Sequence, residues 1–276
     1  MSERNRELAS FLRSRRARLT PEEVGLPRGG RRRIATLRRE DVAWLADVGT
    51  TWYTWLEQGR PIKMAVGTLD RIGEALRLDS SESEYLRKLV YDHGRARGDW
   101  NGLPSPGISA LVRSYTAGHA FVIGPRWDVL ICNERYAALL QLTDGAQGLE
   151  RNGLWLMFTR QRARWVYPDW EATARRMVAT FRVEYAGYVD DRGFGELLEA
   201  LSASSPEFAT LWSDVDVLSP TRWSAGRMRD PDSGRVLNYE TVTLCVPDAP
   251  GQMLVFHVPV ELSLPAEIAQ VVRARN

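Results

Sequence analysis

The chain has 276 residues, of which 44% are hydrophobic and 26% charged, so it can form two domains with buried cores and is too apolar for global disorder. It contains no run of about 18 consecutive apolar residues, which excludes a membrane-spanning helix. Two cysteines are too few for a disulfide framework or a four-cysteine zinc site, and no apolar leader segment is visible. We therefore expect a cytoplasmic protein without a metal or cofactor.

Charge is distributed unevenly along the chain. Residues 1–65 carry 14 Lys and Arg against 8 Asp and Glu, whereas residues 66–276 carry 23 against 27. Only two of the 37 basic residues are lysines, and the arginine side chain suits phosphate or carboxylate because its donors are planar and forked. This layout is typical of a nucleic-acid-binding head on a neutral or acidic body, although a bias in genome composition also enriches arginine.

Residues 1–93 predict an all-α domain, because apolar residues recur there at helical spacing between charged ones. The stretch 94–107 is rich in Gly, Pro and charge and predicts a linker. The five expected helices lie around Leu8–Leu12, over 37–47, over 49–58 with Gly59 as the stop signal, around Leu69–Leu76, and after Asp79.

Residues 108–276 mix strand and helix patterns and predict an α+β domain with an antiparallel sheet. A helix that begins at an Asn cap is expected over 133–142, and a long helix over 169–188. The expected strands are 120–123, 127–132, 221–229, 235–246 and 252–260, and the shorter helices are 193–203, 206–213 and 264–274.

The segment 42–60 contains two short helical patterns separated by about three residues, with the small Ala46 where the helices would cross. This spacing is typical of a helix-turn-helix, but an ordinary αα-hairpin fits it equally well. In a helix-turn-helix the second helix approaches base edges in the major groove of DNA. The residues expected on its exposed face are Thr50, Thr51, Thr54 and Trp55.

The run Arg31, Arg32 and Arg33 has two interpretations. It is either a solvated charge run in a loop or an anchor for DNA phosphates and the narrow minor groove.

Aromatic residues crowd positions 155–185. A stripe of this kind is more often core, and the alternative is a cavity for an elongated apolar ligand such as an acyl chain. Asn133 and Tyr239 are candidate contacts for its polar head, and the arginines at 160, 162 and 164 are candidates for binding a carboxylate. The residues expected to line the cavity are Trp155, Phe158, Trp170, Met177, Phe181 and Phe256.

Longer segments resemble known families. "LADVGTTWYTWLEQGR" resembles the DNA-binding domain of the XRE (phage-repressor-like) helix-turn-helix family. "FLRSRRARLTPEEVGLPRGGRRRIATLRREDVAWLA", "GPRWDVLICNERYAALL", "YPDWEATARRMVATFR", "SPEFATLW" and "LNYETVTL" resemble the MmyB-like bacterial regulators. The resemblance implies a five-helix DNA-binding domain followed by a PAS-like domain that holds a small apolar, fatty-acid-like ligand.

The resemblance also implies roles for single residues. It places the exposed face of the second helix against DNA bases and Arg38 and Arg39 against backbone phosphate, and it implies an ion pair between Arg16 and Glu57. It favours a homodimer, because phage-repressor-like heads read paired half-sites. The sequence departs from the family at Gly49, where a Ser or Thr cap is usual, and at Trp55, where a polar base reader is common.

We therefore expect a bacterial-type transcription regulator that binds double-stranded operator DNA and senses a small apolar ligand. We expect no enzyme, because the sequence lacks the Gly-x-Ser-x-Gly, His-Glu-x-x-His, Cys-x-x-Cys and phosphate-loop motifs. The three histidines, His93, His119 and His257, have no ligand-like spacing. The alternatives are a protein–protein adaptor with a helix-turn-helix fold and a degenerate enzyme in the second domain.

Overall fold

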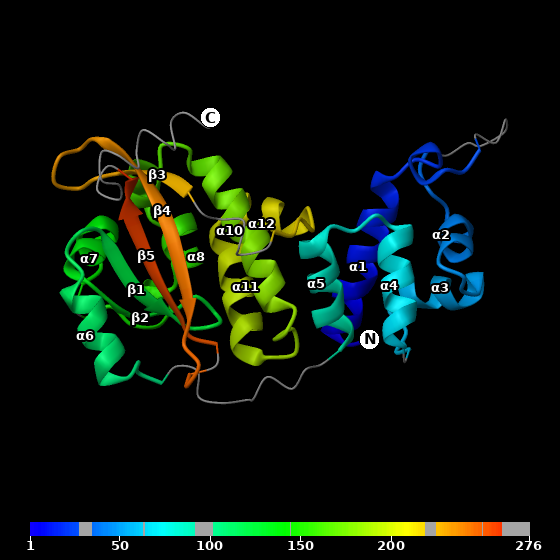
Figure 1. Cartoon of the computed structure of the whole chain (residues 1–276), viewed down its shortest axis with the longest axis horizontal. Coiled ribbons are helices and arrows are strands. Elements are labelled where there is room, and N and C mark those ends of the chain that lie inside the picture. Colours follow the sequence, from blue (N-terminus) through cyan, green and yellow to red (C-terminus); the bar gives the residue numbers. More distant parts are fainter. Residues whose placement is uncertain are drawn as a thin grey trace, which may run out of the picture. The chain divides into compact units, whose positions relative to one another are not determined.

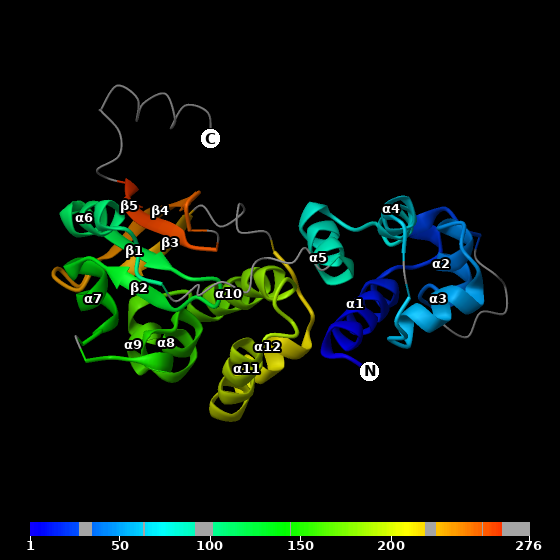
Figure 2. The same cartoon turned by 90° about the horizontal axis from the view of Figure 1, so that it is seen from below.

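The computed structural model describes residues 1–27, 35–62, 64–91, 102–143, 145–218, 225–249 and 251–260. The chain divides into two compact units (Figures 1 and 2). The N-terminal unit comprises Met1–Arg95, Ala179–Glu196 and Leu211–Ser219, and the sheet unit comprises Ala96–Val178, Leu197–Thr210 and Pro220–Asn276.

The regular elements described within the first ninety residues are all helices, as predicted. Ser2 caps the first helix by accepting the Asn5 backbone N–H, and Asp79 and Glu82 form a reciprocal capping box on the fifth α-helix. Phe11 is fully buried and meets the Tyr85 ring edge-on at 4.9 Å. The elements are α1 (Glu3–Arg18), the 3₁₀ helix η1 (Glu22–Val24), α2 (Arg39–Leu45), α3 (Thr50–Glu57), α4 (Val66–Ala75) and α5 (Ser80–Val90).

Two segments from later in the chain, Ala179–Glu196 and Leu211–Ser219, belong to the same unit as these helices. The sequence did not predict this association. Arg182 is 1% exposed, and its Nη1 donates to the Glu7 carboxylate at 3.1 Å. The same carboxylate accepts the Tyr85 hydroxyl at 2.9 Å, and the Arg182 guanidinium lies 3.8 Å from the centre of the Trp212 ring. The buried charge of Arg182 thus has both a carboxylate and an aromatic partner.

The sheet unit contains a five-stranded antiparallel sheet in the order β2-β1-β5-β4-β3. Its strands are β1 (His119–Ile123), β2 (Val129–Cys132), β3 (Ala225–Arg229), β4 (Val236–Cys245) and β5 (Met253–Pro259). It also contains α6 (Pro106–Ser114), α7 (Glu134–Leu140), the 3₁₀ helix η2 (Gly148–Arg151), α8 (Gly153–Thr159) and α9 (Gln161–Val166). The residues of three further helices are divided between the two units: α10 (Trp170–Tyr185), α11 (Arg192–Ser204) and α12 (Pro206–Ser213).

Helices cover both faces of this sheet. Figure 2 shows α6 on one side and α7, α8 and α9 on the other. Because side chains alternate along a strand, Phe121 packs with Tyr136 of α7, whereas Val122 packs with Val112 of α6. We call these the α7 face and the α6 face of the sheet.

The predicted helical region and antiparallel α+β domain are confirmed. Helix α7 begins after the predicted cap, Asn133, and the strands agree with the prediction wherever they are described. The sequence did not predict α6, α8 or α9. Residues 94–101 of the expected linker and the expected helix over 264–274 lie outside the described residues, as do residues 221–224.

Candidate functional site

Helices α2 and α3 are joined by a tight turn. Asp47 adopts a left-handed conformation with φ 52°, and Gly49 precedes α3 without a side-chain cap hydrogen bond, as expected from the sequence. Gly59 also has a positive φ and donates its backbone N–H to Leu56 O at 3.0 Å, while Arg60 N–H reaches Trp55 O at 3.0 Å. This pair of hydrogen bonds is a Schellman motif, so the predicted stop at Gly59 is confirmed.

One side of α3 faces solvent and the other faces the core. Thr50 and Thr51 are exposed, Thr54 is half-buried, and Trp55 has 41% of its surface exposed. Leu56 is buried at the opposite side. The exposed face expected from the sequence is confirmed, and its contact with DNA stays a prediction.

Glu57, the last residue of α3, anchors this helix to α1. Its side chain is fully buried and accepts two hydrogen bonds from Arg16, at 2.6 and 3.0 Å, which confirms the predicted ion pair. Arg39 of α2 binds the same carboxylate at 2.7 Å. Burial raises the pKa of Glu57, but the hydrogen bonds and charges of Arg16 and Arg39 outweigh burial and hold its pKa below the usual value.

The arginines expected to bind phosphate differ in their surroundings. Arg38 is exposed, whereas the guanidinium of Arg39 is already paired with Glu57 and 42% of its side chain is exposed. The Glu57 carboxylate already compensates much of the positive charge of Arg39, so we expect Arg39 to attract a DNA phosphate less strongly than an unpaired arginine would. Arg31, Arg32 and Arg33 lie outside the described residues.

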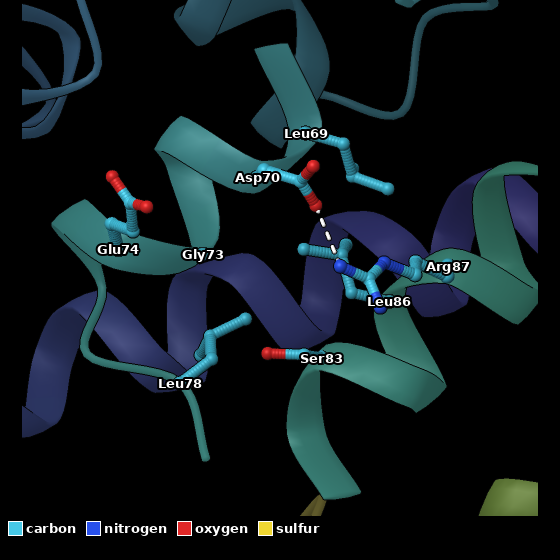
Figure 3. Close-up of a pocket in the computed structure, with 8 residues that line it drawn as sticks. All are labelled: Leu69, Asp70, Gly73, Glu74, Leu78, Ser83, Leu86 and Arg87. Carbon is cyan, nitrogen blue, oxygen red and sulfur yellow. Dashed lines mark hydrogen bonds and ion pairs between the residues drawn. The ribbon is translucent and has the colours of Figure 1, made fainter. Parts of the chain in front are cut away.

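A surface groove of about 370 Å³ lies between α4 and α5 (Figure 3). An ion pair of 2.8 Å joins Asp70 of α4 and Arg87 of α5 across it. Leu69, Leu78 and Leu86 supply apolar lining. This ion pair neutralises both charges and leaves the Glu74 carboxylate as the remaining charged group of the lining, and we assign no ligand to the groove.

The aromatic residues expected to line one cavity do not gather in one place. Phe158 and Trp170 are in direct edge-to-face contact at 5.7 Å in the sheet unit, whereas Phe181 stacks on Phe194 at 5.9 Å in the N-terminal unit. Phe256 lies on the α6 face of the sheet. Strand alternation places Phe256 on the α6 face, whereas α8, which carries Phe158, lies on the other side of the sheet, so the expectation of a single cavity lined by all six residues is wrong. Trp155 is half-buried and Met177 is buried, and no structural observation links either to a ligand.

Asn133 uses its amide group to hold the fold. Its Oδ1 accepts the backbone N–H groups of Tyr136 and Ala120, at 3.0 and 3.1 Å. Its Nδ2 donates to the carbonyl groups of Tyr115 and Gly118, at 2.7 and 2.9 Å. These four bonds use the two donors and two acceptor positions of the amide, so the structure does not support a contact between Asn133 and a ligand head group.

The other candidate head-group contacts also have partners. Tyr239 is buried on the α7 face, where its ring lies 5.1 Å from that of His119, and burial raises its pKa. The three arginines bind protein groups: Arg160 to Glu150 at 3.3 Å, Arg162 to Leu139 O at 3.0 Å and Arg164 to Glu207 at 2.6 Å.

The comparison with known families identifies the second half of the chain. A family model of the MmyB-like transcription regulator ligand binding domain matches residues 104–267. The chain belongs to this family. No curated protein matches the chain. The chain is thus an MmyB-like transcription regulator with a ligand-binding domain, and the matched range contains all five strands of the sheet.

Two buried histidines face each other inside the MmyB-like domain. His119 of β1 and His257 of β5 are register partners, and their ring centroids lie 5.8 Å apart. They are 1% and 7% exposed, and burial lowers their pKa values to about 4 and about 3, so both are neutral at neutral pH. Neither Nδ1 has a hydrogen-bond partner within the described part of the chain.

A cavity of about 20 Å³ lies beside His257 on the α7 face. Sequence reasoning missed both the cavity and the histidine pair, because His119 and His257 are brought together only by the pairing of β1 with β5. The residues that line the cavity are Tyr167, Thr173, Arg176, Gly226, Arg227, Met228, Thr241 and His257.

Within the described residues, no cluster of three or more His, Cys, Asp or Glu is arranged to hold a metal ion. A search of the same residues finds no helix with the length and apolar character needed to cross a membrane.

Proposed function

We propose that this MmyB-like protein is an XRE-type, ligand-responsive transcription regulator that acts in the cytoplasm as a homodimer. In this proposal α3 binds double-stranded operator DNA, and a PAS-like domain built on the sheet binds a small apolar, fatty-acid-like ligand. The chain has no enzymatic role in the proposal. The observation that carries it is the presence, in one chain, of an MmyB-like ligand-binding domain and a helix pair whose second helix has an exposed face.

The DNA-binding part of the proposal is supported by the way α3 is held. The buried Glu57 carboxylate links α3 to Arg16 of α1 and Arg39 of α2, so the exposed face of α3 has a fixed orientation against its own unit. A recognition helix needs this rigidity, because base readout depends on hydrogen-bond geometry. The excess of basic residues in positions 1–65 adds electrostatic attraction to phosphate.

The ligand-binding part is supported by the family and by the fold of the sheet unit. Helices lie on both faces of a five-stranded antiparallel sheet, which agrees with the PAS-like domain implied by the sequence resemblance. The cavity beside His257 and the unpartnered histidine nitrogens lie inside the matched range.

The DNA-binding proposal is tested with a duplex selected from a random-sequence pool by the full chain. Thr50→Ala and Thr51→Ala should reduce the preference for this duplex over random DNA by about 1–3 kcal/mol, because these exposed side chains are within reach of base edges. Thr210→Ala, at an exposed threonine of α12, serves as the control and should leave the preference unchanged. Failure to select any duplex would contradict the proposal and favour the adaptor.

The ligand-binding proposal is tested by mass spectrometry of the natively purified full chain. An acyl compound that copurifies in stoichiometric amount would support the proposal. A chain that carries none and that binds no added fatty acid would contradict it.

A further inference from the structure

Helix α3 lacks the side chains that identify a base through two hydrogen bonds at once. Its residues, 50–57, include no Arg or Lys, which bind guanine in this way, and no Asn or Gln, which bind adenine. The nearest amide side chain, Gln58, follows the helix at its C-cap. A carboxylate can accept from cytosine, but the carboxylate of Glu57 is buried and bound by two arginines. The helix itself therefore offers a base only hydroxyl and apolar groups.

Thr51 and Trp55 form an apolar strip along the exposed face of α3. They are four residues apart, so their side chains are neighbours on the helix surface. Thr51 is exposed, and Trp55 has 41% of its surface exposed, whereas Leu56 turns into the core. The strip thus presents an indole ring beside a threonine methyl group on the face that the proposed function assigns to DNA.

Arg60 holds the Trp55 ring in place. Its guanidinium lies 5.2 Å from the centre of the ring, which is within the range of a cation–π interaction. Its backbone N–H also donates to Trp55 O at 3.0 Å, in the Schellman motif that ends α3. Among the described residues no carboxylate pairs with Arg60. Its positive charge is therefore available to a phosphate beside the base that Trp55 contacts.

The major groove of DNA carries one apolar group that matches this strip. Thymine has a methyl group at C5, and an apolar side chain reads it by contact rather than by hydrogen bonding. Burial of one methyl group is worth about fourfold in affinity. An indole ring whose position is fixed loses little freedom when it makes this contact, so the gain is largely retained.

We propose that Trp55 is a specificity-determining residue that recognises the C5 methyl group of a thymine in the major groove. In this arrangement Thr51 extends the apolar contact, and Arg60 positions the ring and binds the adjacent phosphate. The inference rests on the proposed DNA-binding function and adds the class of base that α3 selects, a thymine in an A·T pair.

The test removes single methyl groups from the duplex selected by the full chain. Each thymine is replaced in turn by deoxyuridine, which loses only the C5 methyl group and keeps the same base pairing. Dissociation constants are measured by fluorescence anisotropy at fixed salt. At one or more thymines, uracil should weaken binding by about fourfold. At the same position, 5-methylcytosine paired with guanine should bind more tightly than cytosine paired with guanine, because it carries the methyl group at the same carbon.

Variants of the protein assign the effect to Trp55. Trp55→Ala should bind the thymine and uracil duplexes equally, and Trp55→Phe, which keeps an aromatic ring, should retain part of the difference. Arg60→Met should weaken binding to selected and random duplexes alike and should also reduce the difference, since the ring loses its support. Trp44→Ala is the matched control, because Trp44 lies on α2 and is 72% exposed. The difference between the two duplexes should survive in this variant.

The outcomes distinguish the inference from the function on which it rests. The absence of any thymine whose methyl group contributes, or a contribution that persists unchanged in Trp55→Ala, would overturn the role of Trp55 and leave the DNA-binding proposal standing. Failure of the full chain to select any duplex would overturn both. Each result is a ratio of two dissociation constants for one variant, so a partly unfolded preparation does not imitate a lost preference.

Discussion

At the scale of single residues, Glu57 ties α3 to α1 and α2 through its ion pairs with Arg16 and Arg39. Glu57→Gln removes the charge that Arg16 and Arg39 share while preserving the shape of the side chain. We expect it to reduce the free energy of unfolding by about 3 kcal/mol, because it leaves a largely buried arginine without a carboxylate. Chemical denaturation of the full chain measures this change.

The matched control is Asp70→Asn, which breaks the exposed ion pair with Arg87 shown in Figure 3. Its cost should be about 0.2–1 kcal/mol, as is usual for solvent-exposed pairs. If the Glu57 variant were no less stable than the Asp70 variant, the buried cluster would not fix α3.

The lowered pKa of Glu57 also predicts a pH dependence. A carboxyl group with a folded-state pKa below its unfolded value of about 4.5 stabilises the fold above pH 4.5, and the stabilisation is lost as the pH falls through the folded-state pKa. The difference in unfolding free energy between wild type and Glu57→Gln should therefore shrink as the pH is lowered from 7 to 3. A difference that stayed constant over this range would contradict the assigned pKa direction.

The candidate sites show how far single residues can be predicted from the sequence. The exposed threonines of α3 and the Arg16–Glu57 pair agree with prediction because they depend on local periodicity and a family resemblance. The pairing of His119 with His257 depends on the register of two strands that are far apart in the sequence. Asn133 was correctly predicted as a cap, and the structure adds that its amide group also bonds to Ala120, Tyr115 and Gly118.

At the scale of elements, Gly59 controls how α3 ends against α1. Its φ is +71°, and an added Cβ would lie 2.9 Å from the Asn5 carbonyl oxygen, which is backbone and cannot easily move. We expect Gly59→Ala to destabilise the chain by more than about 2 kcal/mol, measured by chemical denaturation, since positive φ and a clash both oppose it.

A substitution at Gly25 distinguishes the cost of the positive φ from the cost of the clash. It has φ +78°, but a Cβ there would meet nothing within 4 Å. Gly25→Ala should therefore cost only about 1 kcal/mol, from its backbone conformation. Equal losses in the two variants would show that the approach of α1 to the end of α3 contributes nothing.

The elements that were predicted have clear periodicity or caps, and the elements that were missed do not. Helix α7 follows an Asn cap, and α10 carries a long apolar stripe. Helix α8, by contrast, is an almost continuous apolar run, Gly153–Thr159, whose length and composition do not distinguish helix from strand. Helix α6 follows a Pro- and Gly-rich stretch that the sequence indicated as linker.

At the scale of the whole molecule, the division into units does not follow chain order. Helix α10 contributes Arg176 to the sheet unit and Arg182 to the N-terminal unit. Sequence patterns predict a helix over this range, but they do not show that its last turns pack with α1, because that association depends on tertiary contacts such as Arg182 with Glu7. One continuous helix thus supplies residues to both units.

The basic N-terminal region predicts salt-dependent binding to DNA of any sequence. Replacement of Arg31, Arg32 and Arg33 by Ala should weaken binding to selected and random duplexes alike. The slope of log affinity against log salt concentration should flatten by about 0.9 for each arginine that contacts a phosphate. A variant that lost only its sequence preference would contradict the assignment of these residues as phosphate anchors.

We expect ligand binding in the MmyB-like domain to change DNA binding by the same chain. The direct test is the dissociation constant of the full chain for the selected duplex at fixed salt, determined for the lipid-free protein and for the protein saturated with dodecanoate. The dissociation constant should change by at least about fivefold between the two states, the lower range of allosteric coupling. Equal DNA affinity in the two states, in a protein shown to bind both duplex and dodecanoate, would contradict it.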